Sequence, residues 1–250
     1  MALDRNQKSQ LYEQGYVQIP GGVPQELVHD ALKAINHSLG QGVPAEKIAT
    51  YRAQSFVPEL QSDPAITNLL YRSSAMDVLR SVIDVDRIHP VRSGQVALRF
   101  PIAESTPRPA HPHIDGMYSP SNGVREGTIS NFTALVGVLL SDLPNPNAGN
   151  FTVWPGTHRQ FGEYFRRHGA EALLDGLPPI EMPEPVQITG KAGDLILAHY
   201  TLAHGITMNV SPHIRYAVFF RIKHTEIDES NWQASMQDIW LHWPGMREFA

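Results

Sequence analysis

Two short segments of the sequence carry residue types that bind metals. The first reads His111-Pro112-His113-Ile114-Asp115. Side chains two positions apart on a strand point the same way, so a strand here would bring the His113 imidazole beside the Asp115 carboxylate. That pair is two-thirds of the two-histidine, one-carboxylate set that holds non-haem Fe(II). His111 is the weaker candidate, because Pro112 interrupts a regular strand.

Two histidines further along the chain compete for the third ligand position. They are His199, at the end of an apolar run, and His204, five residues later. Because five is odd, the two imidazoles would lie on opposite faces of a regular strand, and at most one completes the set. Arg215 favours His204, since a turn between two paired strands would place Arg215 opposite Ile206, on the His204 face. A guanidinium there can hold a carboxylate through two parallel hydrogen bonds.

The elements that must position these residues change in type after about residue 89. Before it, apolar spacing predicts helices over 4–13, 24–39 and 66–82 and a strand at 15–20. After it, short apolar runs between turn residues predict strands at 94–100, 131–140, 150–154, 185–188, 194–199, 203–207 and 214–223. Thr157 and Gln160 fit a capping box that begins a helix ending near Gly169. We therefore expect a mainly β protein with flanking helices, a sandwich or barrel, as one domain over residues 1–250.

Two long segments without expected regular structure flank the first motif, at residues 101–112 and 117–128. Long loops in compact proteins often act as lids or binding loops. Whether these two act as lids is left open by the sequence. In the second, Tyr118 and Arg125 are candidates to touch a substrate.

Composition excludes several functional classes. The net charge of −5 argues against a nucleic-acid binder, which needs a basic surplus. The absence of cysteine excludes disulfides, thiolate metal sites and a cysteine nucleophile, and it suits a reducing cytoplasm. The longest apolar run, 132–140, has nine residues, whereas a membrane span needs about 20. We expect a soluble, cytoplasmic protein of 250 residues that does not act at a membrane.

The motifs together resemble one enzyme family. His113-Ile114-Asp115, His204-Gly205 and Arg215 are similar to the pattern of Fe(II)/2-oxoglutarate dioxygenases of the phytanoyl-CoA dioxygenase type. Residues 13–20, 149–158 and 193–194 support the resemblance. It implies a double-stranded β-helix, or jelly roll. The sequence departs from the family at Ile206, where a small polar residue is common, and at Arg99, where lysine is common.

The resemblance also implies the cofactors and the reaction. Fe(II) would bind His113, Asp115 and His204, with no other catalytic side chain, and 2-oxoglutarate and O₂ would take the remaining positions. Arg215 would hold the far carboxylate of 2-oxoglutarate. The products would be succinate, CO₂ and a small molecule hydroxylated at an aliphatic C–H. Because related halogenases lack the carboxylate ligand, Asp115 favours hydroxylation over halogenation.

Several other residues are candidates for binding. Gln95, Arg99 and Thr133 are candidates to contact the cosubstrate, and Trp154 joins Tyr118 and Arg125 as a candidate for the substrate. Gln95 and Arg99 share the polar face of the strand expected at 94–100. That face points either toward the cosubstrate or toward solvent. For Trp154 the alternative is a place in the core.

Two other functions fit the same ligand residues. One is a jelly-roll metal-binding protein without turnover, and the other is a non-redox enzyme of cupin type that hydrolyses or isomerises its substrate. Arg215 argues against the second, because a hydrolase needs no carboxylate anchor at that place. Formation of succinate from 2-oxoglutarate in the presence of iron would distinguish an oxygenase from a metal-binding protein without turnover.

Overall fold

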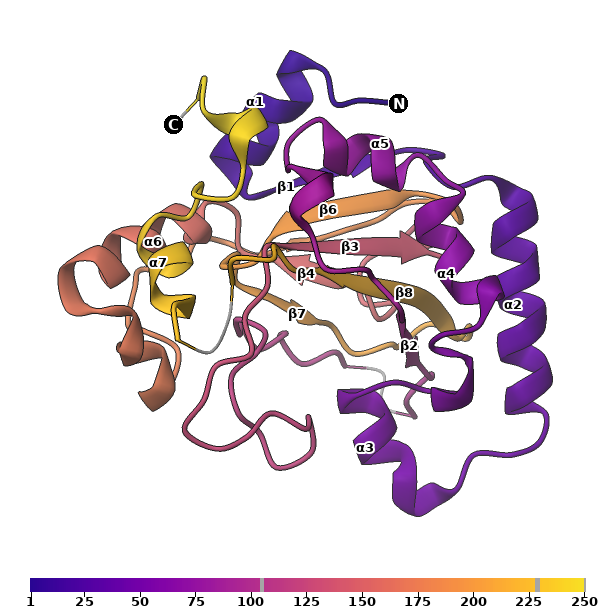
Figure 1. Ribbon diagram of the computed structural model, residues 1–250. Coiled ribbons are helices and arrows are strands. Elements are labelled where there is room, and N and C mark those ends of the chain that lie inside the picture. The colour runs from indigo at the N-terminus through magenta and orange to yellow at the C-terminus, as the bar shows by residue number, and fades with distance from the viewer. Residues whose placement is uncertain (104–105, 228–229, 250) are drawn as a thin grey trace.

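The computed structural model describes residues 1–103, 106–227 and 230–249. Two antiparallel sheets form its centre, one with the strand order β1-β6-β3-β8-β2 and the other with the order β5-β4-β7 (Figure 1). The strands are β1 Tyr16–Ile19, β2 Gln95–Arg99, β3 Ala134–Leu139, β4 Phe151–Val153, β5 Val186–Gln187, β6 Leu195–His199, β7 His204–Ile206 and β8 Arg215–Ile222. Each strand expected from the sequence is therefore present, with shorter ends.

Helices flank the larger sheet on one side and lie beyond one end of the sandwich (Figure 1). They are α1 Arg5–Gln14, α2 Gln25–Leu39, α3 Ile48–Ala53, α4 Pro64–Tyr71, α5 Ala75–Arg80, α6 Thr157–His168 and α7 Trp232–Gln237. Short 3₁₀ helices cover Ala45–Lys47, Pro58–Leu60, Val85–Arg87, Ala170–Asp175 and Pro244–Met246. Among the described helices, none is long and apolar enough to cross a membrane.

Alternation along the larger sheet divides its side chains between two cores. On β3, Val136 and Val138 pack in the cluster that includes α1, α2, α4 and α5, whereas Leu135 and Leu139 join the cluster shared with the smaller sheet. The period of two follows from the pleat of a strand. This alternation therefore also decides which side chains face the space between the sheets.

The helix expected over 66–82 is instead two helices, α4 and α5. Ser73 lies between them, and its hydroxyl donates to the Leu69 carbonyl at 2.6 Å and accepts from the Ala75 N–H at 3.1 Å. A serine that hydrogen-bonds nearby backbone groups competes with the helical pattern. The single-helix prediction was wrong for this local reason, and α3 was not expected at all.

The capping box expected at Thr157 is also absent. Thr157 is the first residue of α6, and Gly156 at φ 82° precedes it without a side-chain cap. The Thr157 hydroxyl instead donates to the Trp154 carbonyl at 2.7 Å and accepts from the Ala203 N–H at 2.9 Å. This contact ties the start of α6 to the residue that precedes β7.

The pairing expected between the strands that carry His204 and Arg215 is wrong. β7 pairs with β4, with His204 opposite Val153, whereas β8 pairs with β2 and β3 in the other sheet. Between β7 and β8, Asn209 donates to the carbonyls of Arg99 at 2.8 Å and His213 at 2.7 Å. These bonds hold the chain where it passes from one sheet to the other, as strands of a jelly roll do.

Candidate metal centre

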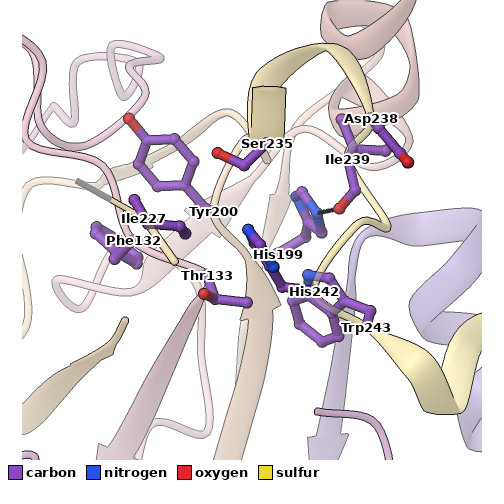
Figure 2. Close-up of a pocket in the computed structure, with 10 residues that line it drawn as sticks. All are labelled: Phe132, Thr133, His199, Tyr200, Ile227, Ser235, Asp238, Ile239, His242 and Trp243. Atoms are coloured by element: carbon purple, nitrogen blue, oxygen red, sulfur yellow. Dashed lines mark hydrogen bonds between the residues drawn. The ribbon is translucent and has the colours of Figure 1, made fainter. Parts of the chain in front are cut away.

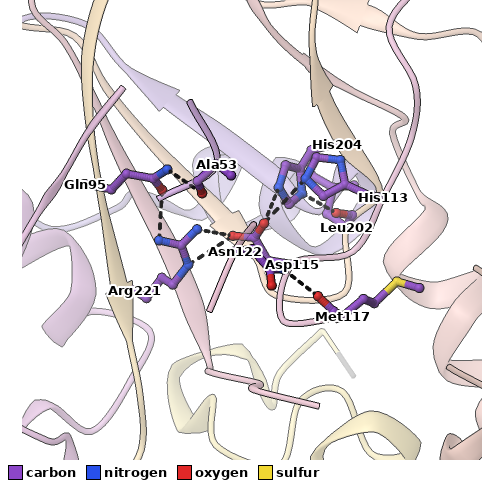
Figure 3. Close-up of polar contacts among 9 residues, drawn as sticks. All are labelled: Ala53, Gln95, His113, Asp115, Met117, Asn122, Leu202, His204 and Arg221. Atoms are coloured by element: carbon purple, nitrogen blue, oxygen red, sulfur yellow. Dashed lines mark hydrogen bonds and ion pairs between the residues drawn. The ribbon is translucent and has the colours of Figure 1, made fainter. Parts of the chain in front are cut away.

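His113, Asp115 and His204 meet in a cavity between the two sheets (Figure 3). Asp115 Oδ1 lies 3.4 Å from His113 Nε2 and 3.5 Å from His204 Nε2, and the two imidazole centroids are 4.5 Å apart. One donor atom from each residue lies within 4.8 Å of the others. Two imidazoles and a carboxylate at these separations fit the ligand set of non-haem Fe(II).

A single backbone bridge brings the two histidines together. The His113 N–H donates to the His204 carbonyl at 2.9 Å, and the His204 N–H donates to the His113 carbonyl at 3.0 Å. His204 Nδ1 lies 3.0 Å from the Leu202 carbonyl, which can only accept, so Nδ1 carries the proton. The Nε2 lone pair of His204 is then free for a metal.

Asp115 reaches the site through a turn rather than along the expected strand. The bridge ends at His113, and the chain turns at Asp115 and Gly116, whose φ is 83°. The Ser130 N–H donates to the Gly116 carbonyl at 2.9 Å, and a Cβ on Gly116 would overlap the Ser130 carbonyl oxygen. The turn therefore requires glycine, because of both its φ and the close backbone approach.

Arg221 forms an ion pair with Asp115 that the sequence interpretation missed (Figure 3). Its Nη2 and Nε lie 2.7 Å and 3.1 Å from Asp115 Oδ2. Burial favours a raised pKa for Asp115, but the charge of Arg221 and the contacts with the His113 and His204 imidazoles together outweigh it and hold this pKa well below its usual range. Arg221 lies six residues after Arg215 on β8, so the alternation already used would have placed both on one face.

Arg215 lies buried at the edge of the same site. Its Nε donates to the Gly149 carbonyl at 2.7 Å and its Nη1 to the Ala97 carbonyl at 3.0 Å, while Nη2 has no hydrogen-bond partner in the described part of the chain. Burial, followed by the charge of neighbouring Arg99, lowers the pKa of Arg215 well below its usual value. A buried donor without an acceptor is costly, so Nη2 suits a bound anion.

Arg99 adds to this positive charge from the cavity wall. Its pKa is lowered to about 10 by burial and then by the charge of Arg52. Arg52 and Arg99 line the cavity, whereas Arg215 lies behind its wall. The donor set therefore fits the dianion 2-oxoglutarate beside a divalent metal: three ligand side chains on one hand, and arginines on the other.

The cavity has a volume of about 770 Å³ and extends from the metal ligands to the loop that follows them. Gln95 lies on its wall from β2. Tyr118 lines it from the loop and is 45% exposed. The Gln54 side chain donates to the Ser121 carbonyl at 2.9 Å, which joins this loop to the end of α3. The expected loop at 101–112 includes residues 104–105, which lie outside the described residues.

The structure places three other candidates away from this cavity. Thr133 is buried, its hydroxyl accepts from the His224 N–H at 3.0 Å, and it lines a separate cavity of about 10 Å³ (Figure 2). Trp154 is buried in the core between the sheets, which matches the alternative considered for it. Arg125 is exposed and is not among the residues that line the cavity.

His199 also lies beside the small cavity rather than the metal ligands (Figure 2). Its Nε2 donates to the Ile239 carbonyl at 2.7 Å, and its Nδ1 accepts from the Thr201 N–H at 3.1 Å. Both ring nitrogens are therefore used in packing contacts. The expectation that His199 points away from the site is confirmed.

A second group of possible ligands, His224, Glu226 and His242, lies elsewhere. The two imidazoles are stacked, with centroids 4.1 Å apart and an angle of 15° between their planes. A nitrogen lone pair lies in the plane of its ring, so two nearly parallel stacked rings do not aim at one ion. Arg87 also pairs with Glu226. We assign no metal to this group.

Comparisons with known proteins agree with this geometry. A family model described as Phytanoyl-CoA dioxygenase (PhyH) matches residues 11–217. No curated protein matches the chain.

Solved structures share the fold. HygX from Streptomyces hygroscopicus, with nickel and 2-oxoglutarate bound, has a TM-score of 0.60 and 18% identity, over 92% of this chain and 90% of its own. The carbocyclase SnoK of nogalamycin biosynthesis has a TM-score of 0.56 and 18% identity, over 93% and 90%. EctD from S. alaskensis, with 2-oxoglutarate and 5-hydroxyectoine, has a TM-score of 0.56 and 18% identity, over 89% of this chain and 76% of its own. The similarity confirms the expected jelly roll with flanking helices.

Proposed function

Because this chain belongs to the phytanoyl-CoA dioxygenase family and is accordingly an Fe(II)/2-oxoglutarate-dependent dioxygenase, we propose that it hydroxylates an aliphatic C–H group of a small molecule. The observation that carries the proposal is the convergence of His113, Asp115 and His204 in one cavity that arginines border. We assign these three residues as the iron ligands and Arg215 as the anchor of the cosubstrate.

The ligand residues prepare the site for its metal. When bound, iron with 2-oxoglutarate and O₂ supplies the oxidation: 2-oxoglutarate loses CO₂ to become succinate with one oxygen atom, and the other is inserted into the substrate C–H. His204 presents Nε2 because the Leu202 carbonyl holds its other nitrogen protonated. Asp115 presents an ionised oxygen, Oδ1, toward both imidazoles. The residues thus offer three donors and leave the rest of the metal surface to the cavity.

The arginines give the cosubstrate its orientation. The free Nη2 of Arg215 would donate to the far carboxylate of 2-oxoglutarate, and Arg99 adds a second positive charge at the cavity wall. Gln95 belongs to this wall but uses its side-chain oxygen to accept from Arg221 at 2.9 Å. Ile206 lines the cavity with an apolar side chain where relatives often carry a polar one, so here it excludes water instead.

The size and lining of the cavity support a small-molecule substrate. Ligand sites commonly measure about 300–1,000 Å³, and this cavity, at about 770 Å³, leaves room beside the cosubstrate. The neighbours HygX and EctD have been solved with hygromycin B and 5-hydroxyectoine, both small molecules. Tyr118 lies where it would contact such a substrate. The carboxylate of Asp115 favours return of oxygen to carbon rather than transfer of a halide.

The test combines isotope labelling with product analysis. Candidate substrates are incubated with the protein, Fe(II), 2-oxoglutarate and ¹⁸O₂ in a buffer that contains chloride, and the products are analysed by mass spectrometry. We expect succinate together with a product heavier by one oxygen atom that carries the label. A chlorinated product would contradict the role given to Asp115. A hydrolysis product formed without 2-oxoglutarate would contradict the oxygenase function itself.

A further inference from the structure

The two oxygens of the Asp115 carboxylate have different surroundings. Oδ1 faces the imidazoles of His113 and His204, at 3.4 Å and 3.5 Å. Oδ2 faces away from them and accepts two hydrogen bonds from Arg221, at 2.7 Å and 3.1 Å. Both guanidinium contacts go to the same oxygen, so only Oδ1 is left to a metal.

Arg221 is held in this position although 42% of its side chain is exposed. Its Nη1 donates to Gln95 Oε1 at 2.9 Å, and its guanidinium carbon lies 5.7 Å from the centroid of the Phe132 ring. Gln95 in turn points its amide nitrogen at the Ala53 carbonyl, 3.5 Å away (Figure 3). An exposed arginine without such contacts would be solvated and mobile, whereas this one is oriented toward Asp115 from several sides.

A carboxylate with both oxygens free can bind a metal through one or both of them. In the proposed reaction, three protein ligands leave three positions, and 2-oxoglutarate and O₂ need all of them. A second bond from Asp115 would occupy one of these positions. The hydrogen bonds on Oδ2 oppose that second bond, because they use its lone pairs and fix the rotation of the carboxylate.

We propose that Arg221 is a positioning residue that keeps Asp115 a one-oxygen ligand and so preserves an open metal position. The inference rests on the proposed function, since it concerns the same metal. It goes beyond the ligand set, because it assigns a role to a residue outside the three proposed metal ligands and the proposed cosubstrate anchor.

The experiment reads the binding mode of the carboxylate directly. Wild-type protein and the Arg221→Met variant are labelled with ¹³C-aspartate and loaded with Ni(II), and infrared difference spectra are recorded between the metal-bound and metal-free forms. The separation between the antisymmetric and symmetric carboxylate stretches is smaller for a two-oxygen ligand than for a one-oxygen ligand. We expect a smaller separation in Arg221→Met, and Arg221→Lys, which keeps the charge without the fork, should recover part of the wild-type value.

Binding of 2-oxoglutarate to the same Ni(II) proteins is measured by calorimetry. Loss of an outer partner of a metal ligand commonly costs about 10- to 100-fold in metal affinity or activity. We expect 2-oxoglutarate to bind more weakly to Arg221→Met, because a second bond from Asp115 would compete with it for a metal position. Two controls separate this effect from loss of positive charge. Arg215→Met should weaken 2-oxoglutarate binding and leave the infrared separation unchanged. Arg167→Met, which removes an exposed arginine paired with Glu163 on α6, should change neither.

The outcomes distinguish this inference from the proposed function. If wild-type protein binds Ni(II) and 2-oxoglutarate but Arg221→Met shows the wild-type infrared separation, the inference is wrong and the function stands. If wild-type protein binds neither, both fail. Should Arg221→Met not fold, the Gln95→Leu variant is used instead. Gln95→Leu removes one contact that orients Arg221 and keeps the positive charge of Arg221. An unchanged separation in Gln95→Leu and Arg221→Lys would equally overturn the inference.

Discussion

Arg99 and Arg215 stand directly opposite each other in the ladder between β2 and β8. Paired residues of an antiparallel ladder project to the same face, so the two side chains lie side by side, Arg99 on the cavity wall and Arg215 buried behind it. Within the described residues neither forms an ion pair with a carboxylate, and one nitrogen of Arg215 has no partner. Like charges at such a position are unfavourable, and a bound dianion would relieve them.

This pair leads to a prediction about the cosubstrate. Replacing Arg215 with methionine should weaken binding of 2-oxoglutarate, because a buried, charge-assisted contact is lost, at a cost of about 2–5 kcal/mol. That corresponds to roughly 30-fold or more. Calorimetry with the Ni(II)-loaded protein measures the effect, and the affinity for Ni(II) itself should be unchanged. If Arg99→Met weakens binding and Arg215→Met does not, Arg99 is the anchor.

The metal ligands give a second prediction. Replacing His113, Asp115 or His204 with alanine removes one of three donors, so each variant should lose most of its affinity for Fe(II) and most succinate formation. Equilibrium dialysis with metal analysis measures the stoichiometry. His111→Ala is the matched control, since His111 is exposed two residues before the first ligand, and it should bind one metal ion. Full binding by His204→Ala would refute the assignment.

Gly116 gives a third prediction about the turn that carries Asp115. A methyl group in Gly116→Ala would meet the Ser130 carbonyl, so the backbone must move and the affinity for the metal should fall. Gly127→Ala is the control, because Gly127 also has a positive φ but its Cβ would meet no atom within 4 Å. The control should lose only the strain of a left-handed alanine, about 1–2 kcal/mol. Chemical unfolding and metal titration compare the two, and equal metal affinity would count against the turn argument.

His199 gives a fourth prediction, about pH. Burial lowers the pKa of His199 to about 4 from its ordinary value of 6.5, although the hydrogen bond to the Ile239 carbonyl opposes the shift. The unfolded chain therefore takes up this proton as the pH falls below about 6.5, while the folded protein resists it until about 4. Stability from this residue is present above the unfolded pKa and is lost as the pH falls through that window, by about 3 kcal/mol in all.

The His199→Phe variant tests this assignment. Phenylalanine keeps a ring against Trp243, on which His199 stacks at 5.2 Å, but cannot titrate. The free energy of unfolding of the variant should therefore change less than that of the wild type between pH 7 and pH 4, as measured by denaturant titration. Parallel pH profiles for the two proteins would show that His199 does not contribute in this way.

Local features of the sequence were enough to predict the strands and to bring forward the three residues that meet in the cavity. Short apolar runs between turn residues mark β2, β3 and β8 as strands. The odd spacing between His199 and His204 separates a ligand from a packing residue, because side chains alternate along a strand. These two inferences depend only on residues close together in the chain, and the structure retains both the strands and the opposite directions of His199 and His204.

Tertiary structure decided which elements lie beside one another. His204 and Arg215 are in different sheets, although a short turn between their strands suggested a hairpin. Asp115 reaches the site because Ser130, from a distant segment, fixes the turn at Gly116. Thr133 belongs to another cavity.

The ion pair between Arg221 and Asp115 joins residues 106 positions apart. The sequence by itself indicated His113, Asp115 and His204 as the candidate metal ligands, and it marked the segments that form strands. The partners of those strands depend on long-range strand pairing, which residue spacing does not encode.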